Sequence, residues 1–470
     1  MTIKSLLRDY GIMRLIPQTI FLLFVFSFYS LNTHAQTWHT VGSPGFSAGG
    51  AAGTSLAINR SGTPYVAYED LGNSNKATVM NYNGSSWVNI GSAGFSTQGA
   101  SSVKIAIDNS GTPYVVYADQ ATFSKAVVKK YYGSNWITVG IEGFSVYQVG
   151  YTSIAIDNSG TPYVVYQDNG NHGKATVMKY DGSSWIAIGS PGFSDSEAAY
   201  TTIAIDRSDT PYVVYEDNGN NGGKATVMKY NGSSWITVGS AGFSAGAAVY
   251  TKIAIDIGGT PYVVYQDYGN QGKATVMKYD GSSWVNIGSA GFSADSAVFT
   301  SIAIDSSSNT PYVAYQDVGN GHKATVMKYN GSSWVAVGSP GFSAGASWPS
   351  AIAINDSGTP YVVYPDSTYG WKATVMRYGL PDDVKNIDKE AHCLEIFPNP
   401  NGGQMNVAFG TAGYHTLQVY DCMGNRVYAT TLTGIEKNAA IDLPALPPGV
   451  YYLHAVSSSN SENIRFVIER

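Results

Sequence analysis

The sequence repeats one unit of 49 or 50 residues seven times between Trp38 and Met376. Each unit passes through TPYVVY, KATVMKY and GSSWxxxG in this order, with small variations. One tryptophan recurs at Trp38, Trp87, Trp136, Trp185, Trp235, Trp284 and Trp334, and one proline recurs with the same spacing at Pro64, Pro113, Pro162, Pro211, Pro261, Pro311 and Pro360. Such a period is typical of architectures in which each unit buries its apolar surface against its neighbours.

Four segments of each unit have the composition of β-strands. Between residues 152 and 189 they are TSIAID, TPYVVYQD, KATVMKY and SSWIAIG, separated by clusters of Gly, Asn, Asp and Ser. In PYVVY both alternating faces are apolar, because Tyr163 and Val165 lie on one side and Val164 and Tyr166 on the other. We therefore expect an all-β fold, a seven-bladed β-propeller of four-stranded blades over residues 36–378.

The two ends of the repeated region complete each other. It begins with a single tryptophan strand at residues 37–42 and stops after KATVMRY at residues 372–378. We expect this first strand to join the last unit, whose other strands are at 351–355, 360–364 and 372–378. The N-terminal strand would then close the ring, and closure removes the open strand edges that invite aggregation.

Residues 1–35 have the pattern of a signal peptide. Lys4, Arg8 and Arg14 precede an apolar stretch at 20–31, and the segment THA at 33–35 offers a small-residue cleavage site. A membrane anchor is the alternative, but the apolar stretch is shorter than the ~20 residues of a spanning helix. We expect cleavage, and no transmembrane segment after it.

The composition excludes several partners. The formal net charge is -6 and the repeats contain no basic cluster, which argues against nucleic acid. His39, His172 and His322 occupy unrelated repeat positions, so we expect no metal site and no cofactor. Cys393 and Cys422 lie outside the repeats, where one disulfide and two free thiols are both open.

The repeat ends at Tyr378, and the charged residues 379–392 are an expected linker to a small domain at 393–470. Phe397, Pro398, Asn399 and Pro400 open that domain, LQVYDCMG follows at 417–424, and IDLPALPPGVYYLHA follows at 441–455. The prolines favour an extended entry, Gly424 a tight turn, and Gly449 precedes an alternating strand that contains Tyr451. This pattern indicates an Ig-like β-sandwich.

In this order, at the C-terminal end, these motifs resemble the type A C-terminal sorting domain of proteins exported by the type IX secretion system of certain Gram-negative bacteria. The basic residue of that family's final strand is matched by Arg465 and Arg470. The resemblance implies that the secretion machinery is a partner. It also implies that the mature protein is secreted or lies on the outer-membrane surface. An ordinary Ig-like accessory domain is the alternative.

Strand order assigns the propeller loops to two faces. We call the upper face the one with the loops that enter the innermost strands and the loops that join second to third strands. Each second strand ends in Asp and each third strand begins with Lys, as Asp168 and Lys174 do. This rim of carboxylates makes Asp168 and Asp267 candidate ligand-binding residues. An ion pair across the hairpin, worth ~0.2–1 kcal/mol, is the favoured interpretation.

A second acidic series has a structural interpretation. Asp108, Asp157, Asp206, Asp256 and Asp305 precede a turn, and Asn59 and Asn355 replace them in the outer units. Either side chain can accept a hydrogen bond from its own turn, so we expect these residues to shape the backbone.

The better ligand candidates vary on the upper face while the frame stays constant. Seven residues after the GFS phenylalanine the units carry Gly53, Ser102, Tyr151, Tyr200, Tyr250, Phe299 and Pro349. Trp348, Tyr147, Tyr268, Tyr369 and Trp371 lie in the same loops. Aromatic faces suit the C–H surfaces of sugars, so we expect Tyr151, Tyr200, Tyr250, Phe299 and Trp348 to bind ligand. Packing between loops is the alternative.

A catalytic site needs a local set of unlike groups, and the repeats show no convincing one. Glu142, Asp195, Glu197 and Asp295 remain as candidate glycosidase carboxylates, which must lie about 5–10 Å apart. We expect a non-catalytic surface protein that binds a ligand, with a glycan as the leading candidate. The alternatives are a glycan-active enzyme and an adhesive protein with a protein partner.

Overall fold

The computed structural model describes residues 36–219, 221–348, 351–379, 394–409, 414–421, 425–432, 438–443, 445–457 and 461–469. The predicted signal peptide, both cysteines, Pro349, Gly424, Arg470 and the linker from residue 380 onward lie outside these residues. The chain divides into two compact units, residues 1–379 and 380–470, and each is described by itself.

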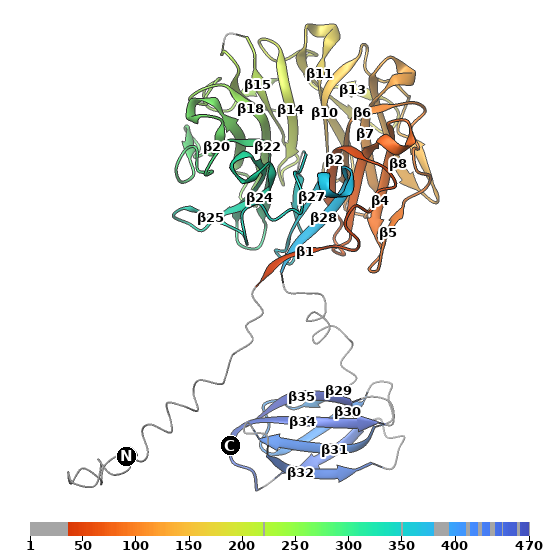
Figure 1. Ribbon diagram of the computed structural model, residues 1–470, viewed down its shortest axis with the longest axis vertical. Helices are drawn as coiled ribbons and strands as arrows, with labels where there is room; N and C mark the ends of the chain where they lie inside the picture. Colours follow the sequence, from red (N-terminus) through yellow and green to blue (C-terminus); the bar gives the residue numbers. More distant parts are fainter. Residues whose placement is uncertain are drawn as a thin grey trace, which may run out of the picture. The chain divides into compact units, whose positions relative to one another are not determined.

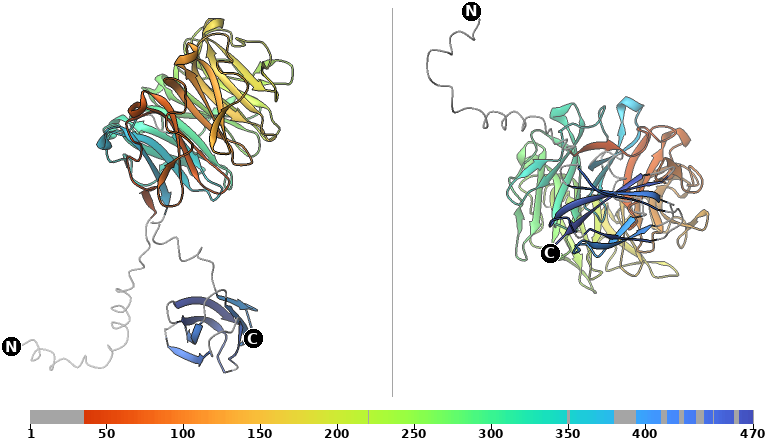
Figure 2. Two further views of the ribbon diagram at one scale, coloured as in Figure 1. Left: turned by 90° about the vertical axis from the view of Figure 1, so that its right-hand side faces the viewer. Right: turned by 90° about the horizontal axis from the view of Figure 1, so that it is seen from below.

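The first unit consists of seven four-stranded antiparallel sheets, the blades, arranged as a ring (Figures 1 and 2). Blades 1 to 6 follow the chain, each with its innermost strand first. Blade 1 contains β2 (Ala51–Ile58), β3 (Pro64–Asp70), β4 (Lys76–Tyr82) and β5 (Trp87–Asn89); blade 2 contains β6 (Ala100–Ile107), β7 (Pro113–Asp119), β8 (Lys125–Tyr132) and β9 (Asn135–Thr138). Blade 3 contains β10 (Val149–Ile156), β11 (Pro162–Asp168), β12 (Lys174–Tyr180) and β13 (Trp185–Ala187).

Blade 4 contains β14 (Ala198–Ile205), β15 (Pro211–Asp217), β16 (Lys224–Tyr230) and β17 (Trp235–Thr237); blade 5 contains β18 (Ala248–Ile255), β19 (Pro261–Asp267), β20 (Lys273–Tyr279) and β21 (Trp284–Asn286). Blade 6 contains β22 (Ala297–Asp305), β23 (Thr310–Asp317), β24 (Lys323–Tyr329) and β25 (Trp334–Ala336). Single 3₁₀ turns join second to third strands at η2 (Leu71–Asn73), η3 (Gln120–Thr122), η4 (Asn169–Asn171), η5 (Tyr268–Asn270), η6 (Val318–Asn320) and η7 (Ser367–Tyr369).

Blade 7 joins the two ends of the repeats, as the sequence predicts. Its strands are β26 (Ala351–Ile354), β27 (Pro360–Asp366), β28 (Lys372–Gly379) and the N-terminal β1 (Thr37–Thr40). β1 lies beside β28 and pairs with it antiparallel (Figure 1). In this register Trp38 lies opposite Tyr378. The Trp38 indole N–H donates to the Val337 carbonyl of blade 6 at 2.7 Å, and Trp185 makes the equivalent bond to Val139 within the continuous chain. The ring is thereby closed.

The apolar cores lie between the blades, because each second strand is covered on both faces. Tyr163 and Val165 pack toward blade 4, whereas Val164 and Tyr166 pack toward blade 2. The alternation predicted for PYVVY is confirmed. Within these cores, each repeat tryptophan stacks on a GFS phenylalanine; the centroids of Trp185 and Phe144 are 4.3 Å apart.

The predicted Asp–Lys ion pairs do not form, although Asp168 lies opposite Lys174 in register. The Asp168 carboxylate is buried and turns toward its own loop, where it accepts from the Gly170 N–H (3.1 Å), the Asn171 amide (2.7 Å) and the Thr176 hydroxyl (2.8 Å). These donors satisfy the carboxylate and draw it away from the lysine. A close Lys–carboxylate pair is found instead between Lys129 and Glu142, at 3.0 Å.

The second acidic series shapes its turns as predicted. The Asp108 carboxylate accepts from the backbone N–H groups of Ser110 (2.9 Å) and Thr112 (2.8 Å). Asn59 accepts from the Thr63 N–H at 2.9 Å in the same way. Because only one acceptor oxygen is needed, Asp and Asn are interchangeable at this position.

The second unit is a small β-sandwich. One sheet has the order β29 (Leu394–Phe397), β30 (Gln404–Phe409), β33 (Asn438–Asp442), and the other the order β32 (Arg426–Thr431), β31 (Tyr414–Asp421), β34 (Gly449–Ser457), β35 (Ser461–Ile468). Both sheets contribute to one core, in which Val407, Leu417 and Phe466 are fully buried.

Motif residues of this unit make hydrogen bonds that fix its entry segment and the start of one strand. Asn399, between Pro398 and Pro400, accepts from the Val467 N–H at 2.9 Å and so ties the entry segment to the last strand. Tyr451, in the strand that begins at Gly449, is buried and donates to the Pro447 carbonyl at 2.8 Å. Phe397 is half-exposed and Arg465 is exposed.

Candidate functional site

Five aromatic side chains form a continuous arc on the upper face, one from each of blades 3 to 7. Tyr151, Tyr200, Tyr250, Phe299 and Trp348 follow one another with ring centroids 4.7, 4.9, 4.6 and 6.3 Å apart. The structure therefore brings together the five aromatic residues that the sequence singles out. Trp371 extends the arc, since its ring centroid is 6.1 Å from that of Trp348.

A β-bulge in the innermost strands of blades 1 to 6 positions the arc residues of blades 3 to 6. The register of β10 with β11 shifts between Gly150 and Ser153, so Tyr151 falls on the extra residue. Left-handed backbone accompanies the bulge, with φ of 47° at Tyr151, 51° at Tyr200, 56° at Tyr250 and 55° at Phe299. This conformation is unfavourable for aromatic residues, and backbone strain of this kind concentrates at functional sites.

Hydrogen bonds between neighbouring blades also hold the arc residues in place. The Thr201 hydroxyl donates to the carbonyl of Tyr151 at 2.6 Å, and Thr251 and Thr300 repeat the contact to Tyr200 (3.1 Å) and Tyr250 (2.9 Å). Each threonine thus binds the carbonyl of the arc residue in the preceding blade. The bonds hold the strained residues in place, so the arc is preorganised.

The arc is interrupted at blades 1 and 2. The equivalent positions are Gly53 and Ser102, which have the same left-handed backbone (φ 57° and 55°) but no ring. At Gly53 a Cβ would approach the Glu69 carboxylate to 3.0 Å, which leaves little room for a side chain.

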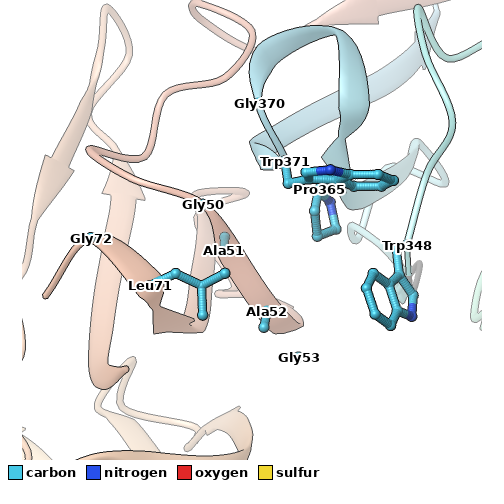
Figure 3. Close-up of a pocket in the computed structure, with 10 residues that line it drawn as sticks. All are labelled: Gly50, Ala51, Ala52, Gly53, Leu71, Gly72, Trp348, Pro365, Gly370 and Trp371. Carbon is cyan, nitrogen blue, oxygen red and sulfur yellow. The ribbon is translucent and has the colours of Figure 1, made fainter. Parts of the chain in front are cut away.

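Where blade 1 lacks the ring, at Gly53, an apolar pocket of about 510 Å³ lies between blades 7 and 1, here called the seam pocket. Trp348, Trp371 and Pro365 lie on one side of it, and Leu71 and Ala52 lie on the other (Figure 3). Trp348 is 55% exposed and Trp371 is 40% exposed, so both rings are available to a ligand. The pocket and the arc share Trp348 and form one surface.

Below the arc, the innermost strands enclose a cavity of about 250 Å³ in the central channel. Serine and threonine line most of it, Tyr250 and Phe299 of the arc line its upper part, and Lys104 and Lys252 project into it. Because protein surrounds both ammonium groups, burial lowers the pKa of each lysine. For Lys252 the pKa falls to about 7, and the charge of Lys104 contributes.

The predicted catalytic carboxylates are not gathered into one site. Glu142 pairs with Lys129, and Asp295 accepts from the Ser296 N–H at 2.7 Å. Glu197 accepts from the Gln167 amide at 3.1 Å, and its charge raises the pKa of a second carboxyl group. That group is Glu216, whose pKa is raised to about 7 by burial and by the charge of Glu197.

The other predicted ligand residues have a different environment. Asp267 is buried like Asp168 and accepts from the Gly269 N–H (2.9 Å), the Asn270 amide (2.8 Å) and the Thr275 hydroxyl (2.8 Å). Since their own loops occupy these carboxylates, we do not place Asp168 and Asp267 in the site. Across the described residues, no group of three or more His, Cys, Asp or Glu side chains could hold a metal ion.

Sequence reasoning missed Lys104, Lys252 and Glu216. The signal was present in the sequence, because each is a charged residue at a repeat position where most units carry an uncharged one. Ser55, Lys104, Ser153, Thr202, Lys252, Ser301 and Ala351 occupy one position of the innermost strands, and Glu216 shares its position with Glu69, Ala118, Gln167, Gln266, Gln316 and Pro365.

Residues 395–469 match the family described as the secretion system C-terminal sorting domain. The predicted sorting domain is thereby confirmed: the second unit is a C-terminal sorting domain, and the protein is secreted or lies on the cell surface. None of the helices in the described residues has the length and apolar character needed to cross a bilayer. Among curated proteins, none matches this chain.

Several solved structures are similar to the chain. They include a triple mutant of AofleA from Arthrobotrys oligospora, with 10% identity over 64% of this chain and 91% of that chain and a TM-score of 0.46. A PL25 ulvan lyase bound to -[GlcA(1-4)Rha3S]- has 12% identity over 74% and 96% and a TM-score of 0.45. A mutant of the Aleuria aurantia lectin in complex with Fucα1-6GlcNAc has 20% identity over 62% and 97% and a TM-score of 0.40. At these values the likeness carries no information about the ligand of this chain.

Proposed function

We propose that the propeller binds carbohydrate on its upper face without transforming it. The observation that carries this proposal is the arc of Tyr151, Tyr200, Tyr250, Phe299 and Trp348, whose rings lie in contact and are held on strained backbone. A chain of aromatic rings offers successive apolar faces to the C–H surfaces of a sugar chain. Ser102 has the same backbone without a ring, so the bulge belongs to the repeat frame, and the run of rings placed on it in blades 3 to 6 supports the proposal.

The seam pocket supports the same function. Its apolar walls, with two exposed indole rings, could take the terminal residue of a chain that runs along the arc. Few charged side chains border the arc and the seam pocket. Ring stacking, together with hydrogen bonds at the edge of the arc, therefore suits a hydroxyl-rich ligand. Because blades 1 and 2 lack the ring, the propeller has one composite site rather than seven equal ones.

A glycan array followed by calorimetry with the best-bound glycan tests this function. Tyr200→Ala and Trp348→Ala should each weaken binding by about 5- to 30-fold, corresponding to about 1–2 kcal/mol for a stacked ring. Tyr132→Ala is the matched control, because Tyr132 is 71% exposed at the end of a third strand, away from the arc. If no glycan binds, or if all three variants bind alike, the proposal is wrong, and an adhesive protein with a protein partner becomes the better candidate.

One observation favours a glycan-active enzyme as the second candidate. Burial and the charge of Glu197 raise the pKa of Glu216 to about 7. Burial and the neighbouring tyrosines raise the pKa of Tyr200 in the arc, and Glu216 contributes to that shift, so this carboxyl group lies near the proposed ligand. A carboxyl group with a raised pKa can act as a general acid. Release of products from the bound glycan by the intact protein, abolished in Glu216→Gln, would replace the binding function with this one. Unchanged glycan after long incubation would exclude it for that glycan.

A further inference from the structure

The central channel contains two cations in a wall that is otherwise rich in hydroxyl groups. Lys104 of β6 and Lys252 of β18 occupy the same position of blades 2 and 5, and the intervening blades carry Ser153 and Thr202 there. In a ring of seven, blades 2 and 5 are as far apart as two blades can be. The two ammonium groups therefore enter the channel from opposite sides.

Their contacts leave positive charge unbalanced. Lys104 Nζ donates to the neighbouring Val103 carbonyl at 3.0 Å. Burial lowers the pKa of Lys104, and the charge of the Glu69 carboxylate partly offsets this. Lys252 Nζ donates to the Thr202 hydroxyl at 3.3 Å, and in the described part of the chain no carboxylate pairs with it. Desolvating an ammonium group without a counter-charge is costly, and Lys252 meets this cost by a pKa of about 7. An anion in the channel would pair with the protonated form and restore its charge.

Hydroxyl groups complete the surroundings that an anion needs. Ser55, Ser153 and Ser301 line the cavity, and each accepts a hydrogen bond from a backbone N–H of a neighbouring blade, which leaves its own hydroxyl hydrogen to donate to an anion. The cavity of about 250 Å³ has room for a small oxyanion with water. Carboxylate and sulfate groups accept several hydrogen bonds at once, from ammonium and hydroxyl donors alike.

The channel lies directly below the arc, since Tyr250 and Phe299 belong to both. We propose that the channel binds a carboxylate or sulfate group carried by the ligand on the upper face, so that the preferred ligand is an acidic carbohydrate. This inference rests on the proposed function and names its ligand class. The arc stacks on the sugar ring, and the two lysines bind the charged substituent that points into the channel.

Calorimetry with matched probes tests this assignment. The probes are methyl β-D-glucuronide, methyl β-D-glucoside and sodium sulfate at constant ionic strength. The proteins are the wild type, Lys104→Met/Lys252→Met, Tyr200→Ala, and Lys278→Met as a control in an outer strand of blade 5. The lysine variant should fold, because Met keeps the length of the side chain and removes a desolvated charge; its melting temperature verifies this.

The wild type and Lys278→Met should bind the glucuronide at least about 10-fold more tightly than the glucoside, consistent with a hydrogen bond to a charged group. In the double lysine variant the preference should vanish while glucoside affinity persists, whereas Tyr200→Ala should weaken both sugars. Sulfate alone should bind the wild type and not the double variant, which separates a free anion from one carried by a sugar.

The outcomes separate the two proposals. Equal affinity for both sugars in the wild type, or a glucuronide preference that survives the loss of both lysines, would overturn the channel site and leave carbohydrate binding intact. Sulfate binding that depends on the lysines, with neither sugar bound, would support the anion site and reject its assignment to a carbohydrate ligand.

Discussion

The substitution Tyr200→Gly tests whether the aromatic arc serves ligand binding or packing between blades. Glycine adopts φ of 51° without strain, so the substitution should recover about 1–2 kcal/mol of backbone energy. It removes ring contacts to Tyr151 at 4.7 Å and Tyr250 at 4.9 Å, each worth about 0.5–1.5 kcal/mol. The entropy of an added glycine contributes a further loss of about 0.5–1 kcal/mol.

These opposing contributions sum to between about 0.5 kcal/mol of stabilisation and about 3 kcal/mol of destabilisation, with a midpoint of about 1 kcal/mol of destabilisation, which urea unfolding of the purified protein can measure. Tyr215→Ala is the control in the same blade, because Tyr215 is fully buried between blades and lies on ordinary strand backbone. Its loss should cost about 3–5 kcal/mol, as for other large aromatic residues in a core. The same two proteins are then titrated with the glycan that the wild type binds best.

A functional arc predicts that Tyr200→Gly is close to the wild type in stability and weakened about 5- to 30-fold in binding. Tyr215→Ala should show the reverse at a temperature where it is folded. If Tyr200→Gly is destabilised as much as Tyr215→Ala, or if it binds the glycan like the wild type, the arc is inter-blade packing and the reasoning fails.

Three further predictions concern closure, pH and export. Deleting residues 37–42 removes β1 with the Trp38 bond to Val337, so the ring should open and aggregate; size-exclusion chromatography of a still monomeric deletion protein with unchanged melting would contradict closure by this strand. Lys252 has a pKa of about 7 in the folded protein against an ordinary 10.5, so between these values the unfolded chain binds a proton that the folded chain does not, and stability should rise as pH increases from 7 to 10.5. Glu69 and Lys104, the interacting charged groups on the opposite side of the channel, remain in Lys252→Met, whose stability should rise less over this window in denaturant titrations at each pH. A reporter fused to residues 393–470 and supplied with a signal peptide should leave the cells of a type IX-competent host, and retention of the reporter in the periplasm would refute the sorting role.

Much of the architecture was predictable because it depends on local pattern repeated seven times. PYVVY has no polar face, so its sheet requires cover on both sides, and the lone strand of Trp38 lacks partners that the last repeat supplies. The sorting domain was predictable for a related reason, since short turn and proline motifs near the chain end suffice to identify it.

The candidate site was only partly predictable. Variation within a constant frame singled out Tyr151, Tyr200, Tyr250, Phe299 and Trp348, but the bulge that aligns their rings depends on the pairing of first and second strands. The ion pair expected of Asp168 and Lys174 was wrong because strand register brings residues opposite each other without deciding where their side chains turn. Nearer hydrogen-bond donors in the loop set the orientation of the Asp168 carboxylate.

The sequence by itself determined the number of blades, their strand order and the closure of the ring, since these follow from period, alternation and the two matching ends. Only the tertiary structure decided that Lys104 and Lys252, about three repeats apart, share one channel, and that Gly53 and Trp348 border one pocket. Circular closure is the physical reason. It places equivalent positions of distant repeats around a common axis and brings the first repeat beside the last. Residues that differ from the repeat consensus in separate units therefore meet and form a site that no single unit contains.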